Sequence, residues 1–168
     1  MARIKESILI DSTPEKVYAY VSHVDKWANW FSGLGDVKSV EGDGSPGTVI
    51  HQSYSLMGKD VDVVTTIKEN GPAAGGGYLW RNERGGGLPG WQTLTFDPQD
   101  GKTLVTSELE YEMPGGIFGK AANHLGVKAS IERSLHHALE NLKNLSEEDW
   151  FIGRREKKEE ESPPPCES

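Results

Sequence analysis

The sequence of 168 residues has little of what three large classes of protein require. Cys166 is its one cysteine, so neither an internal disulfide nor a thiolate metal site can form from this chain alone. No apolar run approaches the roughly 20 residues of a membrane-spanning helix. The formal net charge of -8 and the scattered Lys and Arg residues disfavour contacts with nucleic acid phosphates. We therefore predict a protein without a nucleic acid partner, stable membrane insertion or cofactor.

The composition is that of a globular protein, with 35% hydrophobic and 26% charged residues. The length suits one domain, which we place at residues 1–150. The N-terminus enters an alternating pattern at once and lacks the apolar core of a signal peptide, so we expect a cytoplasmic protein. Residues 151–168 are charged and Pro-rich, and we predict that residues 153–168 are disordered because they cannot bury enough apolar surface. Arg154 to Lys158 in this tail could bind a protein partner.

Alternation with period two, interrupted by turn residues, predicts antiparallel strands over most of the chain. In the last of them Val105, Leu109 and Tyr111 share a face opposite Glu108 and Glu110, which indicates one dry and one wet face. The predicted strands are residues 3–11, 36–41, 48–57, 60–69, 76–83, 91–97 and 103–113.

Helical patterns lie between the first two strands and after the last one. Thr13, Pro14 and Glu15 form a helix start, with the Thr side chain as a cap. A second short helix is predicted at residues 26–31. Residues 117–145 are predicted as one long helix whose second half has an apolar stripe that must pack on the dry sheet face. The stripe consists of Ile131, Leu135, Ala138, Leu142 and Leu145.

This order of elements and four short segments resemble the START-related SRPBCC superfamily, especially its polyketide cyclase/dehydrase-like branch. The resemblance covers about residues 3–145, and its segments are 10–18, 27–31, 101–103 and 139–143. It implies an α+β helix-grip fold: a curved seven-stranded antiparallel sheet, two short helices, and a long C-terminal helix over the concave face. It also implies a cavity between sheet and C-terminal helix for lipids, steroids, quinones, plant hormones or polyketides, without choosing among them.

Aromatic residues from several elements are the candidates for lining this cavity, since rings supply large apolar area with an occasional polar group. Core packing is the alternative explanation for about half of them. The Tyr111 hydroxyl or the Trp80 indole could orient a ligand carbonyl, and His124 could face either the cavity or the solvent. The predicted ligand-binding residues are Phe31, Tyr54, Trp80, Leu88, Trp91, Tyr111, Phe118 and His124.

Two glycine-rich segments are candidates for a functional role. Residues 42–47 match G-x-G-x-x-G, but a strand rather than a helix follows them, so we predict a hairpin turn and not a pyrophosphate site. Residues 85–90 could form a flexible lid with Leu88 at the pocket mouth, or an ordinary loop. His136 and His137 are adjacent and point about 100° apart on a helix, so we predict no metal site.

Catalytic residues are not evident in the pattern. The polar groups that could face inward and serve an enzyme are His51, Tyr54, Ser107, Tyr111 and His124, and the pattern does not decide which face of the strand with His51 is the inner one. No paired inward carboxylate or nucleophile motif is present. A carrier or sensor of a hydrophobic small molecule is the leading hypothesis. A cyclase or dehydratase that uses the same pocket, and a regulatory interaction domain of a larger complex, are the alternatives.

Overall fold

The computed structural model describes the backbone of residues 2–112 and 124–161, and the side chains of residues 2–112 and 125–148. Several expectations therefore lie outside the described residues. Among them are the start of the long helix at Ile117, the ligand contact of Phe118, and the orientation of the His124 side chain.

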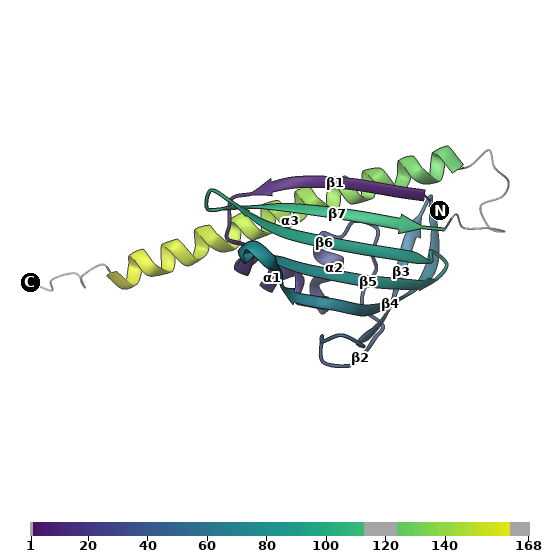
Figure 1. The fold of residues 1–168 in the computed structure, drawn as a ribbon, viewed down its shortest axis with the longest axis horizontal. Helices are drawn as coiled ribbons and strands as arrows, with labels where there is room; N and C mark the ends of the chain where they lie inside the picture. The colour runs from purple at the N-terminus through teal and green to yellow at the C-terminus, as the bar shows by residue number, and fades with distance from the viewer. Residues whose placement is uncertain (1, 113–123, 162–168) are drawn as a thin grey trace, which may run out of the picture.

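Seven antiparallel strands form one curved sheet in the order β1-β7-β6-β5-β4-β3-β2 (Figure 1). The last strand pairs with the first, so that Ile4 lies opposite Leu109 and Ile8 opposite Val105. This arrangement confirms the predicted α+β helix-grip fold. The strands are β1 (Ala2–Ile10), β2 (Ser39–Glu41), β3 (Val49–Leu56), β4 (Lys59–Pro72), β5 (Tyr78–Gly86), β6 (Gly90–Gln99) and β7 (Lys102–Tyr111).

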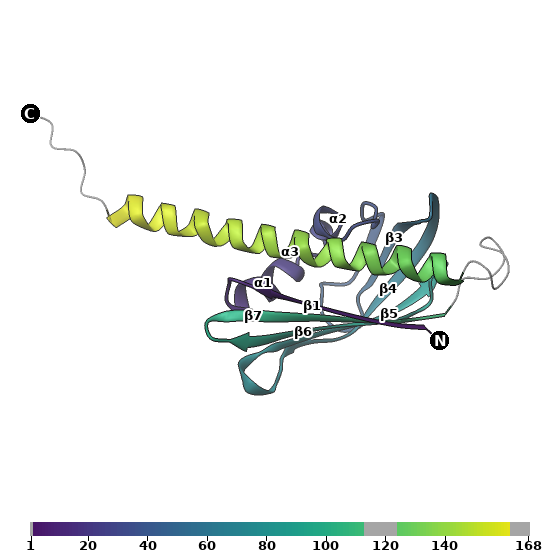
Figure 2. The same ribbon diagram turned by 90° about the horizontal axis from the view of Figure 1, so that it is seen from above.

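The helices lie together on one side of this sheet (Figure 2). Two short 3-10 segments, η1 (Val24–Lys26) and η2 (Ala74–Gly76), join other elements. Thr13 has the extended conformation of an N-cap, but its side chain makes no capping hydrogen bond, so that detail of the helix start was wrong. The three α-helices are α1 (Pro14–Val21), α2 (Trp27–Trp30) and α3 (His124–Glu161).

The two faces of the sheet differ as the alternation predicts. On β7, Val105, Leu109 and Tyr111 are buried on the inner face. The outer face has ion pairs between neighbouring strands, including Lys68 Nζ to Glu83 Oε2 at 2.7 Å. The core therefore lies between the inner face and the helices.

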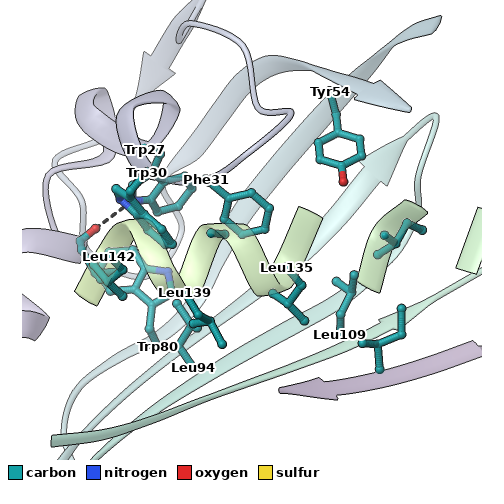
Figure 3. Close-up of a cluster of buried hydrophobic side chains, with 14 of the residues drawn as sticks. Trp27, Trp30, Phe31, Tyr54, Trp80, Leu94, Leu109, Leu135, Leu139 and Leu142 are labelled. Atoms are coloured by element: carbon teal, nitrogen blue, oxygen red, sulfur yellow. Dashed lines mark hydrogen bonds between the residues drawn. The ribbon is translucent and has the colours of Figure 1, made fainter. Parts of the chain in front are cut away.

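The apolar stripe of α3 packs on this inner face. Ile131, Leu135, Ala138 and Leu142 are buried as predicted, while Leu145 is only partly buried. In Figure 3 the α3 side chains Leu135 and Leu139 lie near Leu94 and Leu109 of the sheet. Contact between α3 and the sheet is concentrated on β1.

The end of α3 differs from the prediction, because the helix continues beyond Leu145 to Glu161 and projects past the sheet (Figure 2). We predicted disorder for residues 153–168; the backbone of residues 153–161 is helical, and residues 162–168 lie outside the described part of the chain. The expectation weighed burial alone, whereas Arg, Lys and Glu also have high intrinsic helix propensity. The domain boundary at residue 150 and a partner-binding role for the tail stay predictions.

In the glycine-rich segment 85–90, Gly85 and Gly86 end β5 and Gly90 begins β6, so that only residues 87–89 form the connection and the segment is not a six-residue lid. Gly86 pairs with Val63 of β4, and Gly90 pairs with Tyr111 of β7. A Cβ at Gly90 would lie 2.0 Å from the Glu110 carbonyl oxygen, so the close approach of the strands requires glycine there. Leu88 is buried in the short connection. The other glycine motif, residues 42–47, forms the predicted turn between β2 and β3.

Within residues 2–112 and 124–161, none of the helices is both long and apolar enough to cross a membrane. No cluster of three or more metal-ligating side chains occurs in this described part. His136 and His137 are exposed and both approach Glu140, at 3.1 and 3.7 Å. The absence of a metal site stays a prediction.

Truncation of the α3 stripe should weaken the whole fold. We expect Leu142→Ala to lower the free energy of unfolding by about 2–5 kcal/mol, because the side chain is fully buried and leaves a cavity. Leu125→Ala on the same helix is the matched control, since Leu125 is 82% exposed and should cost no more than about 0.5 kcal/mol. Urea unfolding followed by circular dichroism measures both. Equal losses would contradict the packing described.

Candidate functional site

The site begins with the alternation of β5. Arg81 and Glu83 point outward, so Trp80, Asn82 and Arg84 point to the inner face, where all three are buried. The same pattern on β6 buries Gln92 and Leu94. The middle of the inner face therefore contains polar side chains among apolar ones. The polar members, here called the polar cluster, are Gln52, Thr65, Asn82, Arg84 and Gln92.

A pocket separates the polar cluster from the segment around α2. The centre of a water-sized sphere can occupy about 20 Å³ of it, which is room for one or two water molecules. Besides the polar cluster, it is lined by Val21, Trp27, Trp30, Phe31, Leu34 and Leu94.

The described pocket lies between the sheet and α2, so the cavity expected between the sheet and the C-terminal helix stays a prediction. Among the described residues, none from α3 lines this pocket. The α3 stripe packs closely on the sheet near β1, which leaves the space toward β3–β6 to be covered by α2. α3 contributes indirectly, because Asn141 Nδ2 donates a hydrogen bond to the Trp30 carbonyl oxygen at 3.2 Å.

Aromatic residues form the wall opposite the polar cluster. The Trp27 indole donates to the Val21 carbonyl oxygen at 2.7 Å and contacts the Trp80 ring edge-on, with centroids 5.9 Å apart (Figure 3). The Trp30 and Phe31 rings are 5.5 Å apart. These contacts restrict the side-chain torsions of Trp27, Trp30 and Phe31 and so fix their rings at the edge of the pocket.

Arg84 is the one charged residue of the polar cluster. It is 7% exposed, and its Nη2 donates to Gln92 Oε1 at 2.6 Å. Its guanidinium carbon lies 5.6 Å from the centroid of the Phe31 ring, within the range of a cation–π contact. Burial lowers the pKa of Arg84, an effect that the nearby Tyr54 hydroxyl partly opposes. An arginine nevertheless stays protonated in proteins.

The other polar side chains near Arg84 include the amides of Gln52 and Asn82, and hydrogen bonds fix the orientation of both. Gln52 Nε2 donates to the Gly35 carbonyl oxygen at 3.1 Å, which leaves Gln52 Oε1 buried without a partner among the described residues. Asn82 Oδ1 accepts from the Trp80 indole at 2.8 Å. A carbonyl oxygen can only accept, so the amide nitrogen of Gln52 must face Gly35.

The predicted ligand-binding residues divide between the two faces of the sheet. Phe31 lines the pocket. Trp80 lies beside it, but its indole nitrogen is engaged by Asn82. Tyr54 is buried and stands apart from the other labelled rings (Figure 3), and Leu88 is buried as well; neither lines the pocket.

Trp91 lies on the outer face, contrary to the expectation. It lines a groove there with Arg81, whose guanidinium carbon is 4.5 Å from the Trp91 ring centroid. His51 also belongs to the outward set of β3, because Ile50 and Gln52 on either side of it are buried. The inward phase of β3 cannot be read from the sequence, because both of its faces have bulky residues. On β6 the phase was readable, since Leu94 and Phe96 share the face opposite Trp91.

Tyr111 is fully buried at the end of β7, and its hydroxyl has no hydrogen-bond partner among the described residues. Burial raises the pKa of Tyr111, and the Glu132 carboxylate raises it further. The residue does not line the pocket, so a ligand contact through its hydroxyl stays a prediction.

The sequence prediction missed the polar cluster, although a signal for part of it was present. If the charged Arg81 and Glu83 face outward, period two places Asn82 and Arg84 inward. A buried arginine is rare without a paired acid, so the residue type alone does not favour an inward Arg84.

The arrangement of the strands and helices, together with the position of the pocket, defines a helix-grip domain of the START type with a small pocket under its short helices. A family model described as polyketide cyclase / dehydrase and lipid transport matches residues 1–147. The chain belongs to that family. No sequence among curated proteins matches this chain significantly.

Solved structures share the fold at low sequence identity. The Zhui aromatase/cyclase from a Streptomyces species is 12% identical, with a TM-score of 0.68 over 87% of this chain and 93% of that one. A STAR-related lipid transfer protein from Xanthomonas axonopodis is 13% identical, with a TM-score of 0.68 over 86% and 85%. A START superfamily protein from Mycobacterium smegmatis is 15% identical, with a TM-score of 0.65 over 87% and 97%.

Removal of Arg84 and removal of its partner should have opposite effects on stability. We expect Arg84→Met to leave the free energy of unfolding unchanged or raise it, since a buried charge is replaced by an apolar chain. Gln92→Leu should lower it by about 1–3 kcal/mol, because the charge then loses its acceptor. Urea unfolding at neutral pH measures both. A large loss with Arg84→Met alone would show that the arginine stabilises the fold.

Proposed function

We propose that this domain binds a hydrophobic small molecule in the pocket between α2 and the sheet, as a carrier or sensor. The observation that supports it best is the pairing of an aromatic wall with a buried polar cluster across a small pocket. Such pockets, mostly apolar with a few convergent polar groups, are typical of small-molecule sites. The family description, which includes lipid transport, agrees with this ligand class.

Binding requires the pocket to widen. Its free volume of about 20 Å³ is far below the several hundred Å³ of a site for a drug-sized molecule. The ligand must therefore displace side chains of the aromatic wall, which belong to a four-residue helix and the loop after it. Apolar burial of about 25 cal/mol per Å² would drive that opening.

The polar groups of the lining favour binding over catalysis. They are three amides, a hydroxyl and a guanidinium, which hold and orient a ligand but do not exchange protons readily at neutral pH. The cyclase or dehydratase alternative needs a proton-transfer group within reach of the reacting atoms. We therefore place the carrier or sensor first.

The test uses two neighbouring residues of β6 whose side chains point to opposite faces of the sheet. Leu94 lines the pocket and Thr93 lines the outer groove. We expect Leu94→Trp to fill the pocket and lower the affinity for the neutral dye N-phenyl-1-naphthylamine about tenfold or more, while Thr93→Trp leaves it unchanged. Dye fluorescence gives the affinity, and circular dichroism melting shows whether each variant is folded.

The proposal would be overturned if a folded Leu94→Trp protein bound the dye as the parent does. It would also be overturned if the parent bound neither the dye nor any member of a lipid, quinone and polyphenol panel. Native mass spectrometry of the protein from its own host gives an independent readout, since a retained ligand adds its mass.

A further inference from the structure

The charge of Arg84 is not neutralised by the protein itself. No carboxylate lies within ion-pair distance of it among the described side chains, although it is 7% exposed. A guanidinium has five N–H donors, and one hydrogen bond, to Gln92, is formed within the described residues. A buried cation is costly in free energy unless it is paired with an anion. The position of Arg84 therefore favours the binding of an anion from outside the protein.

A second, independent group points into the same pocket. Gln52 is 2% exposed and lines the pocket, and its Oε1 is buried without a hydrogen-bond donor. The hydrogen bond from Gln52 Nε2 to the Gly35 carbonyl oxygen fixes the orientation of the amide, so Oε1 cannot turn away from the pocket without breaking that bond. A buried acceptor of this kind favours a ligand that brings a hydroxyl group.

The free space is also of the right size for a head group. The volume of about 20 Å³ accommodates one or two heavy polar groups, while the rings of Trp30 and Phe31 lie on the other side of it. A planar guanidinium matches the geometry of a carboxylate, which can accept two parallel N–H bonds.

We propose that the ligand of this pocket is an amphipathic carboxylic acid with a hydroxyl group near the carboxylate. The carboxylate accepts hydrogen bonds from Arg84, the hydroxyl donates to Gln52 Oε1, and the apolar body displaces the ring of Phe31. This inference rests on the proposed function and adds the chemical class of the ligand.

The test compares acids with their neutral isosteres by isothermal titration calorimetry. The probes are salicylate and 3-hydroxydecanoate, each paired with its primary amide, so that one body is aromatic and the other a chain. We expect the parent protein to bind at least one acid about tenfold or more tightly than its amide, because charge-assisted hydrogen bonds are about twice as strong as neutral ones. We expect benzoate or decanoate, which lack the hydroxyl, to bind several-fold more weakly than the corresponding hydroxy acid.

Three variants separate the contributions. Arg84→Met should abolish the preference for the acid over the amide, and circular dichroism melting shows whether the variant is folded. Gln52→Leu should abolish the advantage of the hydroxyl but keep the preference for the acid. Arg81→Met is the matched control, since Arg81 lies on the outer face of the same strand and should change neither preference.

Equal affinity for acid and amide in the parent would overturn the inference, as would a preference that survives in Arg84→Met or is lost in Arg81→Met. If the dye binds but no acid is preferred, the ligand class is wrong and the proposed function stands. If neither dye nor acids nor amides bind, both are wrong.

Discussion

The packing of the α3 stripe on the sheet is the interaction on which the rest of the structure depends. The inner face of an antiparallel sheet this wide has more apolar surface than one helix can cover. α3 buries Leu135, Leu139 and Leu142 near β1 and β7, and its Asn141 is bonded to the carbonyl of Trp30. α2 is thereby held over the remaining part of the sheet, and the pocket lies where α2 and the sheet do not meet completely.

The pocket is unusual in placing a cation on the dry side of the sheet. Most of the inner face is apolar and could be closed by larger apolar side chains at no electrostatic cost. Instead Arg84 is buried with one amide as its bonded partner and one aromatic ring above it. Buried ionisable groups in such environments are enriched at binding and catalytic sites.

The projecting end of α3 shows how two physical criteria can disagree. Composition predicted disorder after residue 153 because the segment has almost no apolar surface to bury. The same Glu, Lys and Arg residues have high helix propensity, and a helix that already has many turns is extended at little further cost. Burial decides whether a segment packs, and propensity decides what its backbone does when it does not pack.

The sequence by itself determined the order and type of the elements, since period two and the α3 stripe are local properties of the chain. It also contained the direction of Asn82 and Arg84, through their outward neighbours Arg81 and Glu83. Only the tertiary structure decided the face of His51, the place of glycines 86 and 90 within the sheet, and the position of the pocket under α2. Those features depend on which strands lie side by side and on how much space α3 leaves, and residues far apart in the chain determine both.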